Sequence, residues 1–248
     1  FDRIVIETTG LADPGPIART IGTDPMLCRQ MRLAGILVTV DGLHGDHQLA
    51  LHAECLRQVA IADRLVVTKS DLVSPDAFGV LSATLRSINA DARILDGHSF
   101  RRAMWPELDE MIAERKSLLR CAPALEMRHG SVSSVHIETD RSIEWTAFAV
   151  WLSAFVHRYA DKVLRVKGLL CVPGLPGPLA LHCVRDHIHP PDHLEAWPDE
   201  SRSSRIVFIV QDIDAGALRR SLLDFIGHTA PASGGDVTKS AAATLDAA

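Results

Sequence analysis

Short apolar runs alternate with longer amphipathic stretches over the first part of this 248-residue chain. Residues 3–7, 33–41, 63–68 and 92–95 are almost continuously apolar, which is typical of strands buried on both faces. Between them, residues 47–62 have helical spacing, and Ser74 followed by Pro75 is a typical helix start with Ser74 as the N-cap. Strands that alternate with helices predict an α/β fold built on a doubly wound parallel sheet.

The alternation ends near the middle of the chain. Residues 103–120 predict a last helix packed on the first sheet. Residues 121–131 contain Pro123, His129 and Gly130 and break the pattern. We therefore place a first domain at residues 1–120 and a linker at residues 121–131.

The second domain, residues 132–228, has its own order of elements. One helix places Trp145, Phe148, Leu152 and Phe155 on a single face, so we expect this domain to have its own core and to fold independently. The order of elements predicts a small α+β domain with both helices on one face of a sheet. The Ala-, Ser- and Gly-rich tail at residues 229–248 is expected to be disordered. Within the domain, the predicted strands are residues 132–138, 162–172, 179–185 and 205–211, and the predicted helices are residues 144–157 and 215–225.

Composition and charge exclude several classes of partner. Hydrophobic residues make up 47% of the chain and charged residues 23%, as in globular domains. The net charge of −5 gives no electrostatic reason to expect a nucleic-acid partner, because proteins that bind nucleic acid usually carry a basic surface. No apolar run approaches the roughly 20 residues that span a bilayer, so we expect no membrane partner. Five cysteines without a Cys-x-x-Cys pair fit a reducing compartment, and we expect a cytoplasmic protein.

Two strand ends carry the candidate chemistry. Glu7 closes the first apolar run and is followed by Thr-Thr and then Gly10. At the carboxyl end of a parallel strand, an acid can hold Mg2+ through water and a glycine N–H can bond to a terminal phosphate, so both are catalytic candidates. Lys69 and Asp71 follow the third run, where Asp71 can accept two hydrogen bonds from guanine while the Lys69 stem packs over the base. Asp41 ends the second run, and its position favours a turn-forming role over one in the nucleotide cleft.

These residues belong to longer segments that resemble the CobW-like family of P-loop GTPases. Residues 7–14, Glu-Thr-Thr-Gly-Leu-Ala-Asp-Pro, match the family's magnesium and γ-phosphate motif. Residues 68–71, Thr-Lys-Ser-Asp, match its guanine motif, except that Thr68 stands where Asn is usual. Residues 164–170 and 205–210 are typical of the family's carboxy-terminal domain. The resemblance implies a partial P-loop NTPase sheet followed by a small α+β domain of the CobW C-terminal type.

The resemblance also implies a function. The family contains GTP-binding, GTP-hydrolysing metallochaperones and metalloenzyme activators, linked to cobalamin biosynthesis, nitrile hydratase activation and zinc homeostasis. For this chain it implies GTP and Mg2+ as ligands, with Glu7 holding Mg2+ through water. It further implies Zn2+ or Co2+ as the transported metal and a client metalloprotein as partner. The resemblance implies that Thr68, Lys69, Asp71 and His98 contact the nucleotide. His98 follows the next strand, where GTPases place a loop against the guanine oxygen.

The phosphate-binding loop of such GTPases is missing from the sequence. That loop reads Gly-x-x-x-x-Gly-Lys followed by Ser or Thr, and no Gly-Lys pair occurs anywhere in the chain. The family's Cys-x-Cys-Cys metal motif is missing as well. We therefore expect an amino-terminally truncated fragment that does not hydrolyse GTP by itself.

Two other interpretations stay open. A nucleotide-independent module would keep the fold and only dock a partner protein. A zinc hydrolase would use His187, His189 and His193 as ligands, because residues at i and i+2 on a strand share a face. The plainer explanation for these three histidines is a polar, proline-containing loop.

Overall fold

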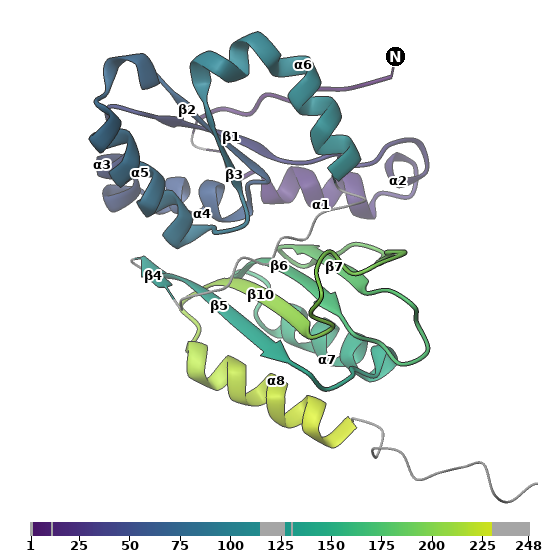
Figure 1. Cartoon of the computed structure of the whole chain (residues 1–248). Helices are drawn as coiled ribbons and strands as arrows, with labels where there is room; N and C mark the ends of the chain where they lie inside the picture. Colours follow the sequence, from purple (N-terminus) through teal and green to yellow (C-terminus); the bar gives the residue numbers. More distant parts are fainter. Residues whose placement is uncertain (1, 11, 115–126, 130, 230–248) are drawn as a thin grey trace, which may run out of the picture.

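The computed structural model describes residues 2–10, 12–114, 127–129 and 131–229 (Figure 1). The described strands form a 3-stranded sheet in the first part of the chain and a 7-stranded sheet in the second part. All pairings in the first sheet are parallel, and all pairings in the second are antiparallel. The predicted α/β first domain and α+β second domain are therefore confirmed.

The first sheet has the strand order β1-β2-β3, with β2 between its two parallel neighbours. Helix α6 lies on one face of this sheet, and α1 and α4 lie on the other, as a doubly wound sheet requires (Figure 1). The strands are β1 (Leu37–Asp41), β2 (Arg64–Thr68) and β3 (Arg93–Asp96). The helices are α1 (Gly15–Thr23), α2 (Leu27–Gln30), α3 (Gly45–Leu51), α4 (Ala53–Ile61), the 3-10 helix η1 (Ser70–Leu72), α5 (Pro75–Ile88) and α6 (Gly97–Glu114).

The prediction of a buried strand at residues 3–7 was wrong. This segment has no regular secondary structure, and Ile4, Val5 and Ile6 are 52%, 73% and 55% exposed. A strand is stabilised by hydrogen bonds to a neighbour and by packing of its faces, and no described strand of the first sheet pairs with this segment. Arg3 instead forms an ion pair with Asp109 on α6.

Two predicted helix boundaries in the first domain can be compared with the structure. The helix predicted over residues 47–62 is divided into α3 and α4, because His52 adopts an extended conformation with φ −117° and ψ 110°. The predicted start of α5 is confirmed, since the Ser74 hydroxyl accepts a hydrogen bond of 3.2 Å from the Ala77 N–H. Capping residues thus located a helix end that apolar spacing alone did not.

Helix α6 begins at Gly97, six residues before the predicted start at residue 103. Ala103 is a kink with φ −117° and ψ 20°. The ring of Pro106 clashes with the carbonyl four residues earlier in a regular helix, which explains a kink in this turn. Residues 115–120 of the predicted helix lie outside the described residues. Within the ranges described, no helix is long and apolar enough to cross a membrane.

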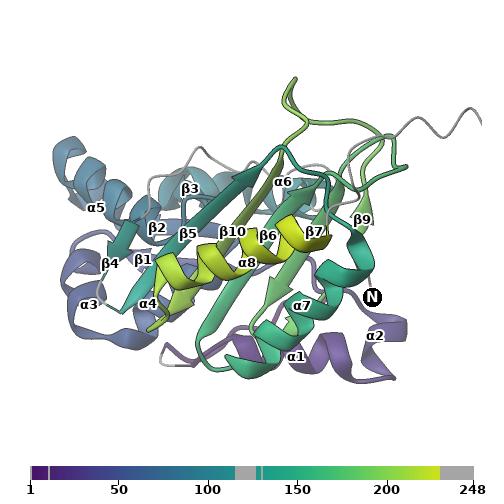
Figure 2. The same cartoon turned by 90° about the horizontal axis from the view of Figure 1, so that it is seen from below.

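The second sheet has the order β4-β5-β10-β6-β7-β8, with β9 also paired to β7. Helices α7 and α8 cover one face of this sheet (Figure 2). Met127–His129 forms a strand inside the range assigned to the linker; residues 121–126 and 130, and the predicted tail beyond Thr229, lie outside the described residues. The strands are β4 (Met127–His129), β5 (Val132–Thr139), β6 (Val163–Leu170), β7 (Leu179–Val184), β8 (His187–Ile188), β9 (Asp192–His193) and β10 (Ser204–Gln211), and the helices are α7 (Trp145–Arg158) and α8 (Ala215–Thr229).

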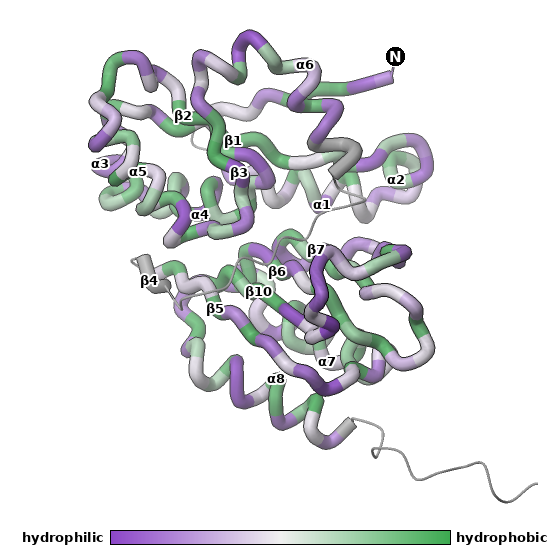
Figure 3. The backbone as a smooth tube through the Cα atoms, viewed as in Figure 1, coloured by the Kyte–Doolittle hydropathy of each residue, from purple (hydrophilic) through white to green (hydrophobic). Residues whose placement is uncertain are grey.

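The other face of the second sheet packs against helices of the first domain. Along β10, Ile206, Phe208 and Val210 face the core under α7 and α8, while Val207 and Ile209 belong to the core shared with the first domain. Helix α4 contacts β6, α5 contacts β4 and β5, and α1 contacts β7 and β8. Figure 3 shows hydrophobic residues along the strands of both sheets. The two domains therefore share a continuous apolar interface.

A buried ion pair crosses this interface. Arg165 on β6 is 1% exposed and donates hydrogen bonds to the Ile61 carbonyl and the Asp63 carboxylate, both at the entry to β2. Lys167 lies 3.8 Å from the same carboxylate, and Asp63 also accepts a 2.8 Å hydrogen bond from the Ile36 N–H. Burial alone raises the pKa of Asp63, but the charges of Arg165 and Lys167 outweigh it and hold that pKa well below its usual range.

Candidate functional site

The carboxyl ends of the three parallel strands meet at one edge of the first sheet. Asp41 at the end of β1 is paired in register with Thr68 at the end of β2, and Val67 is paired with Asp96 at the end of β3. The Thr68 hydroxyl donates a 3.2 Å hydrogen bond to the Val40 carbonyl and so ties β2 to β1. In parallel α/β sheets this edge is where ligands bind.

Lys69 leaves β2 in the left-handed conformation, with φ 54°. Its ammonium lies 2.6 Å from the Asp41 carboxylate, whose other oxygen accepts hydrogen bonds from the N–H groups of Leu43 and His44. The hydrogen bond from Lys69 is the main reason that the pKa of Asp41 is lowered. Asp41 therefore forms the turn, as predicted, and also fixes the lysine.

Asp96 holds the next part of the same loop and was not predicted as a site residue. It accepts hydrogen bonds from the Ser70 hydroxyl, from the Ser99 hydroxyl at 2.7 Å and from the N–H groups of His98 and Ser99. These bonds, led by that from Ser70, hold the pKa of Asp96 well below its usual range. The sequence carried a signal for this role, because Asp is among the preferred N-cap residues of helices.

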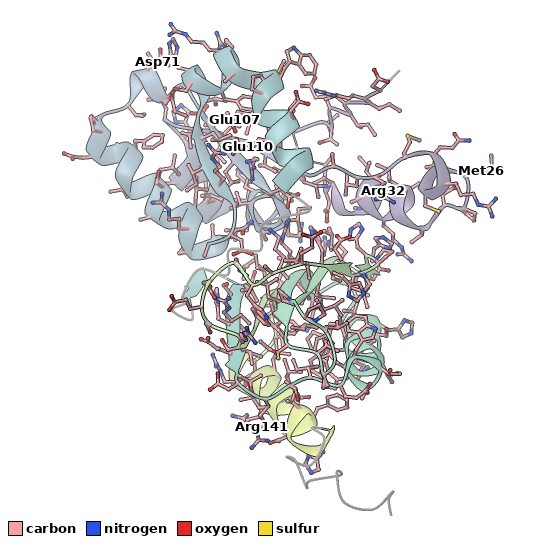
Figure 4. All side chains as sticks on the ribbon, turned by 45° about the vertical axis from the view of Figure 1, so that its right-hand side comes forward. Met26, Arg32, Asp71, Glu107, Glu110 and Arg141 are labelled. Carbon is pink, nitrogen blue, oxygen red and sulfur yellow. The ribbon has the colours of Figure 1, made fainter. Side chains whose placement is uncertain are left out.

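Asp71 lies one residue beyond Ser70, in η1, and its side chain is exposed. Figure 4 places it at the outer end of the first domain, away from the second domain. His98 lies in the first turn of α6 and is exposed. The preceding Gly97 passes so close to β2 that a Cβ atom there would lie 2.7 Å from the Val67 carbonyl oxygen. The structure thus brings the Lys69–Asp71 loop next to the start of α6.

A shallow hollow of about 540 Å³ adjoins this loop. Leu43, Leu72 and Val80 line it, and their side chains are 46%, 63% and 62% exposed. Its charged lining residue is Asp46, which repels anions. The hollow is therefore unsuited to a phosphate group.

Glu7 and Gly10 lie in the segment that leads to α1. Glu7 is exposed, and a Cβ atom built on Gly10 would have nothing within 4 Å. The Gln58 side-chain amide on α4 donates hydrogen bonds of 3.0 and 2.8 Å to the carbonyls of Gly10 and Ala12. The segment is therefore fixed at its carboxyl-terminal end, next to α1.

The three candidate zinc histidines are not brought together. His187 and His189 have ring centres 4.4 Å apart, but His193 pairs with Leu179 at the far end of β7 from Val184, the partner of His187. Five residues of strand separate these two pairings by about 17 Å. Among the residues that the structure describes, no three His, Cys, Asp or Glu side chains could hold a metal ion.

Two family models match the chain. The model "CobW/HypB/UreG, nucleotide-binding domain" matches residues 1–96, and "Cobalamin synthesis protein cobW C-terminal domain" matches residues 132–226. The first match contains the loop from Thr68 to Asp71, and the second contains β5 to β10. Residues 97–131, between the two matches, contain α6 and the range 121–131 that was predicted as a linker.

Curated relatives and a solved structure agree with these matches. The zinc chaperone YjiA of Escherichia coli is 31% identical over 216 residues, which cover 84% of this chain and 66% of YjiA. The zinc-regulated GTPase metalloprotein activator 1 of Schizosaccharomyces pombe is 39% identical over 97 residues, which are 39% of this chain and 24% of that protein. The crystal structure of the Zn(II)-bound YjiA GTPase superposes with a TM-score of 0.74 at 28% identity, covering 91% of this chain and 71% of that chain.

The chain thus spans about two thirds of the length of YjiA. The two family models match in the order expected, and the loop from Thr68 to Asp71 follows the central strand of the parallel sheet. The chain belongs to the CobW-like GTPase family.

Proposed function

We propose that this chain provides the guanine-recognising loop and the second domain of a GTP-hydrolysing zinc metallochaperone or metalloenzyme activator. The observation that carries this proposal is the anchoring of the Lys69–Asp71 loop by two strand-end carboxylates. Asp41 holds Lys69 from one side and Asp96 holds Ser70 from the other. A loop anchored in this way presents Asp71 in one orientation before a ligand arrives, which lowers the entropic cost of binding.

The chemistry of Asp71 favours guanine. A carboxylate is acceptor-only, and the guanine edge offers two donors, N1–H and the 2-amino group. Adenine has an acceptor at N1 and no amino group at C2, so it cannot form the same pair of bonds. The Lys69 stem packs over the base in this proposal, while its ammonium stays on Asp41.

In this proposal, Glu7 and Gly10 contact the phosphate groups of the same nucleotide and their magnesium ion. The exposed carboxylate of Glu7 has the hard oxygen donors that Mg2+ prefers, so it fits a magnesium ion held through water. Bound Mg2+ would neutralise phosphate charge, and the Gly10 N–H would donate to the terminal phosphate. The transported metal is cargo rather than a resident cofactor. Zinc is supported by the names of the relatives, with cobalt as the alternative.

The test is base selectivity measured on this chain. We expect millimolar or weaker affinity for GTP, a binding free energy no stronger than about −4 kcal/mol, so the method is NMR titration with GDP, ADP and inosine and xanthosine diphosphates. We expect chemical-shift changes at Lys69 and Asp71 with GDP, smaller changes with the inosine nucleotide, which lacks the 2-amino group, and none with ADP. Asp71→Asn removes a charged hydrogen bond and should cost about 1–3 kcal/mol with GDP.

The xanthosine nucleotide provides the positive control for this experiment. Its 2-oxo group accepts a hydrogen bond, so the amide of Asp71→Asn should bind it better than the native carboxylate does. Asp76→Asn, an exposed acid in the first turn of α5, is the matched control and should change nothing. Equal responses to GDP and ADP would refute guanine recognition, and no response to either nucleotide would favour a nucleotide-independent partner-binding module.

A further inference from the structure

One residue of the segment from Glu7 to Pro14 contacts the second domain through an ion pair. Asp13 lies three residues after Gly10, and its carboxylate forms an ion pair with Arg185, at the end of β7. The two side chains are only 28% and 16% exposed. The other carboxylate oxygen of Asp13 accepts a 2.9 Å hydrogen bond from the Gly15 N–H, where α1 begins. Asp13 therefore connects the phosphate motif, α1 and the second domain.

Arg185 is held in place independently of Asp13. Its backbone N–H donates a 3.1 Å hydrogen bond to the Leu164 carbonyl, and its guanidinium donates a 3.1 Å hydrogen bond to the Asp161 carbonyl. Its backbone is left-handed, with φ 56°, which costs energy for a residue that carries a Cβ atom. A strained backbone held by several bonds is typical of a residue with a positional role.

Helix α1 rests directly on the turn that carries Arg185. A Cβ atom on Gly22 would lie 2.1 Å from the His187 ring, and one on Gly15 would lie 2.8 Å from Cγ of Arg185. The missing side chains at these two positions on α1 allow this close approach. A second ion pair, Arg19 with Asp186 at 2.8 Å, joins the same two elements but is more exposed, with 59% of the Arg19 side chain accessible.

We propose that Arg185 is a positioning residue that the second domain supplies to the nucleotide motif. It fixes Asp13, and Asp13 fixes the end of the segment that carries Glu7 and Gly10. The Gln58 amide holds the carbonyls of Gly10 and Ala12 from the first domain, so the motif is held by both domains. Because coupling between sites is reciprocal, a nucleotide that moves this segment also changes the turn at Arg185. The functional part of this inference rests on the proposed nucleotide site; the positional part does not.

Hydrogen–deuterium exchange of this chain without ligand tests the positional part. Arg185→Gln should speed exchange in residues 8–15 about tenfold, since coupling energies of interacting residues correspond to factors of this size. Asp13→Asn, which keeps the oxygen for the Gly15 N–H, should do the same, and the double variant should add little to either. Asp186→Asn removes the neighbouring ion pair as the matched control and should leave residues 8–15 unchanged.

Addition of GDP with Mg2+ tests the functional part. The nucleotide should slow exchange around residues 163–170 and 185 in the native chain, and Arg185→Gln should abolish that response while GDP still binds at Asp71. Equal effects of Arg185→Gln and Asp186→Asn on residues 8–15 would overturn the positional role. GDP binding with an unchanged response in Arg185→Gln would overturn the coupling. A failure of GDP to bind would instead refute the nucleotide site and leave the ligand-free result standing.

Discussion

Replacing Asp63 by Asn tests what joins the two domains. The carboxylate is the counter-ion of Arg165, which is 1% exposed and therefore has little access to water. Asn has almost the same shape and keeps an oxygen to accept the 2.8 Å hydrogen bond from the Ile36 N–H. The substitution therefore removes the charge and leaves the local packing in place.

The expected cost follows from the burial of the two partners. Breaking a buried ion pair by removing one partner costs about 3–5 kcal/mol, because the other charge stays buried without compensation. The Asp63 side chain is 18% exposed, so water screens part of the effect, and we expect about 3 kcal/mol. For a chain of this size, 1 kcal/mol shifts the melting temperature by about 2–4 °C, so Asp63→Asn should melt about 6–12 °C lower.

Urea unfolding of four proteins measures this cost: the native chain, Asp63→Asn, Arg165→Met and the double variant. Arg165→Met places an apolar side chain of similar length in an apolar interface, and the double variant should cost less than the sum of the single changes by about 1–3 kcal/mol. A cost below about 1 kcal/mol for Asp63→Asn, or strict additivity, would refute the idea that this ion pair is a buried connection between the domains.

Two further predictions concern titration and loop anchoring. Burial, followed by the charge of Arg165, holds the pKa of His182 well below its ordinary value. As the pH falls, the unfolded chain therefore binds a proton before the folded chain does, and stability should decrease below about pH 6.5 by up to about 1.4 kcal/mol per pH unit. His182→Gln should flatten that part of the stability curve in a pH series of urea melts. Asp96→Ala removes the N-cap of α6 and the acceptor of the Ser70 hydrogen bond, so it should lower the free energy of unfolding in urea by about 1–2 kcal/mol and speed amide exchange in η1. Unchanged exchange in η1 would contradict the anchoring role.

The sequence predicted the strands of the first sheet from their apolar runs, and the signal is strongest in the central strand β2, which is buried on both faces. Leu65, Val66 and Val67 form a continuous apolar run, because the side chains on both faces of the strand are buried. Residues 3–7 have the same composition and were misassigned for that reason. A strand depends on its neighbour for hydrogen bonds, and an apolar run alone does not reveal whether a neighbour is present.

The anchors of the candidate site were harder to predict than its motif. Lys69 and Asp71 were recognised from their spacing, but the partners that hold the loop are Asp41 and Asp96, 28 and 26 residues away from the residues they bind. A carboxylate at a strand end can cap a turn, bind a ligand or pair with a cation, and sequence spacing does not separate these roles. Only the register of β1, β2 and β3 brings these partners to one edge.

The interface between the domains was missed although β10 carried its signal. The expectation of an independently folding second domain considered only the core under α7 and α8. In β10 the residues between the core positions, Val207 and Ile209, are apolar as well, and they are 6% and 2% exposed. A sheet with one solvent-facing side would have polar residues there, so a continuous apolar run on β10 indicates cover on both faces.

This apolar face leads to a prediction for the second domain alone. A protein comprising residues 127–229 would expose Leu164, Val207 and Ile209, each worth roughly 1.5–3 kcal/mol when fully buried, against a total stability of about 5–15 kcal/mol for a typical domain. We expect it to self-associate through this face in size-exclusion chromatography with light scattering. The double substitution Val207→Thr and Ile209→Thr should restore a monomer. Val210→Thr, on the other face of the sheet in the core under α7 and α8, should unfold it. A stable native monomer of residues 127–229 would show that the apolar face contributes little, and the sheet would then be held by α7 and α8 alone.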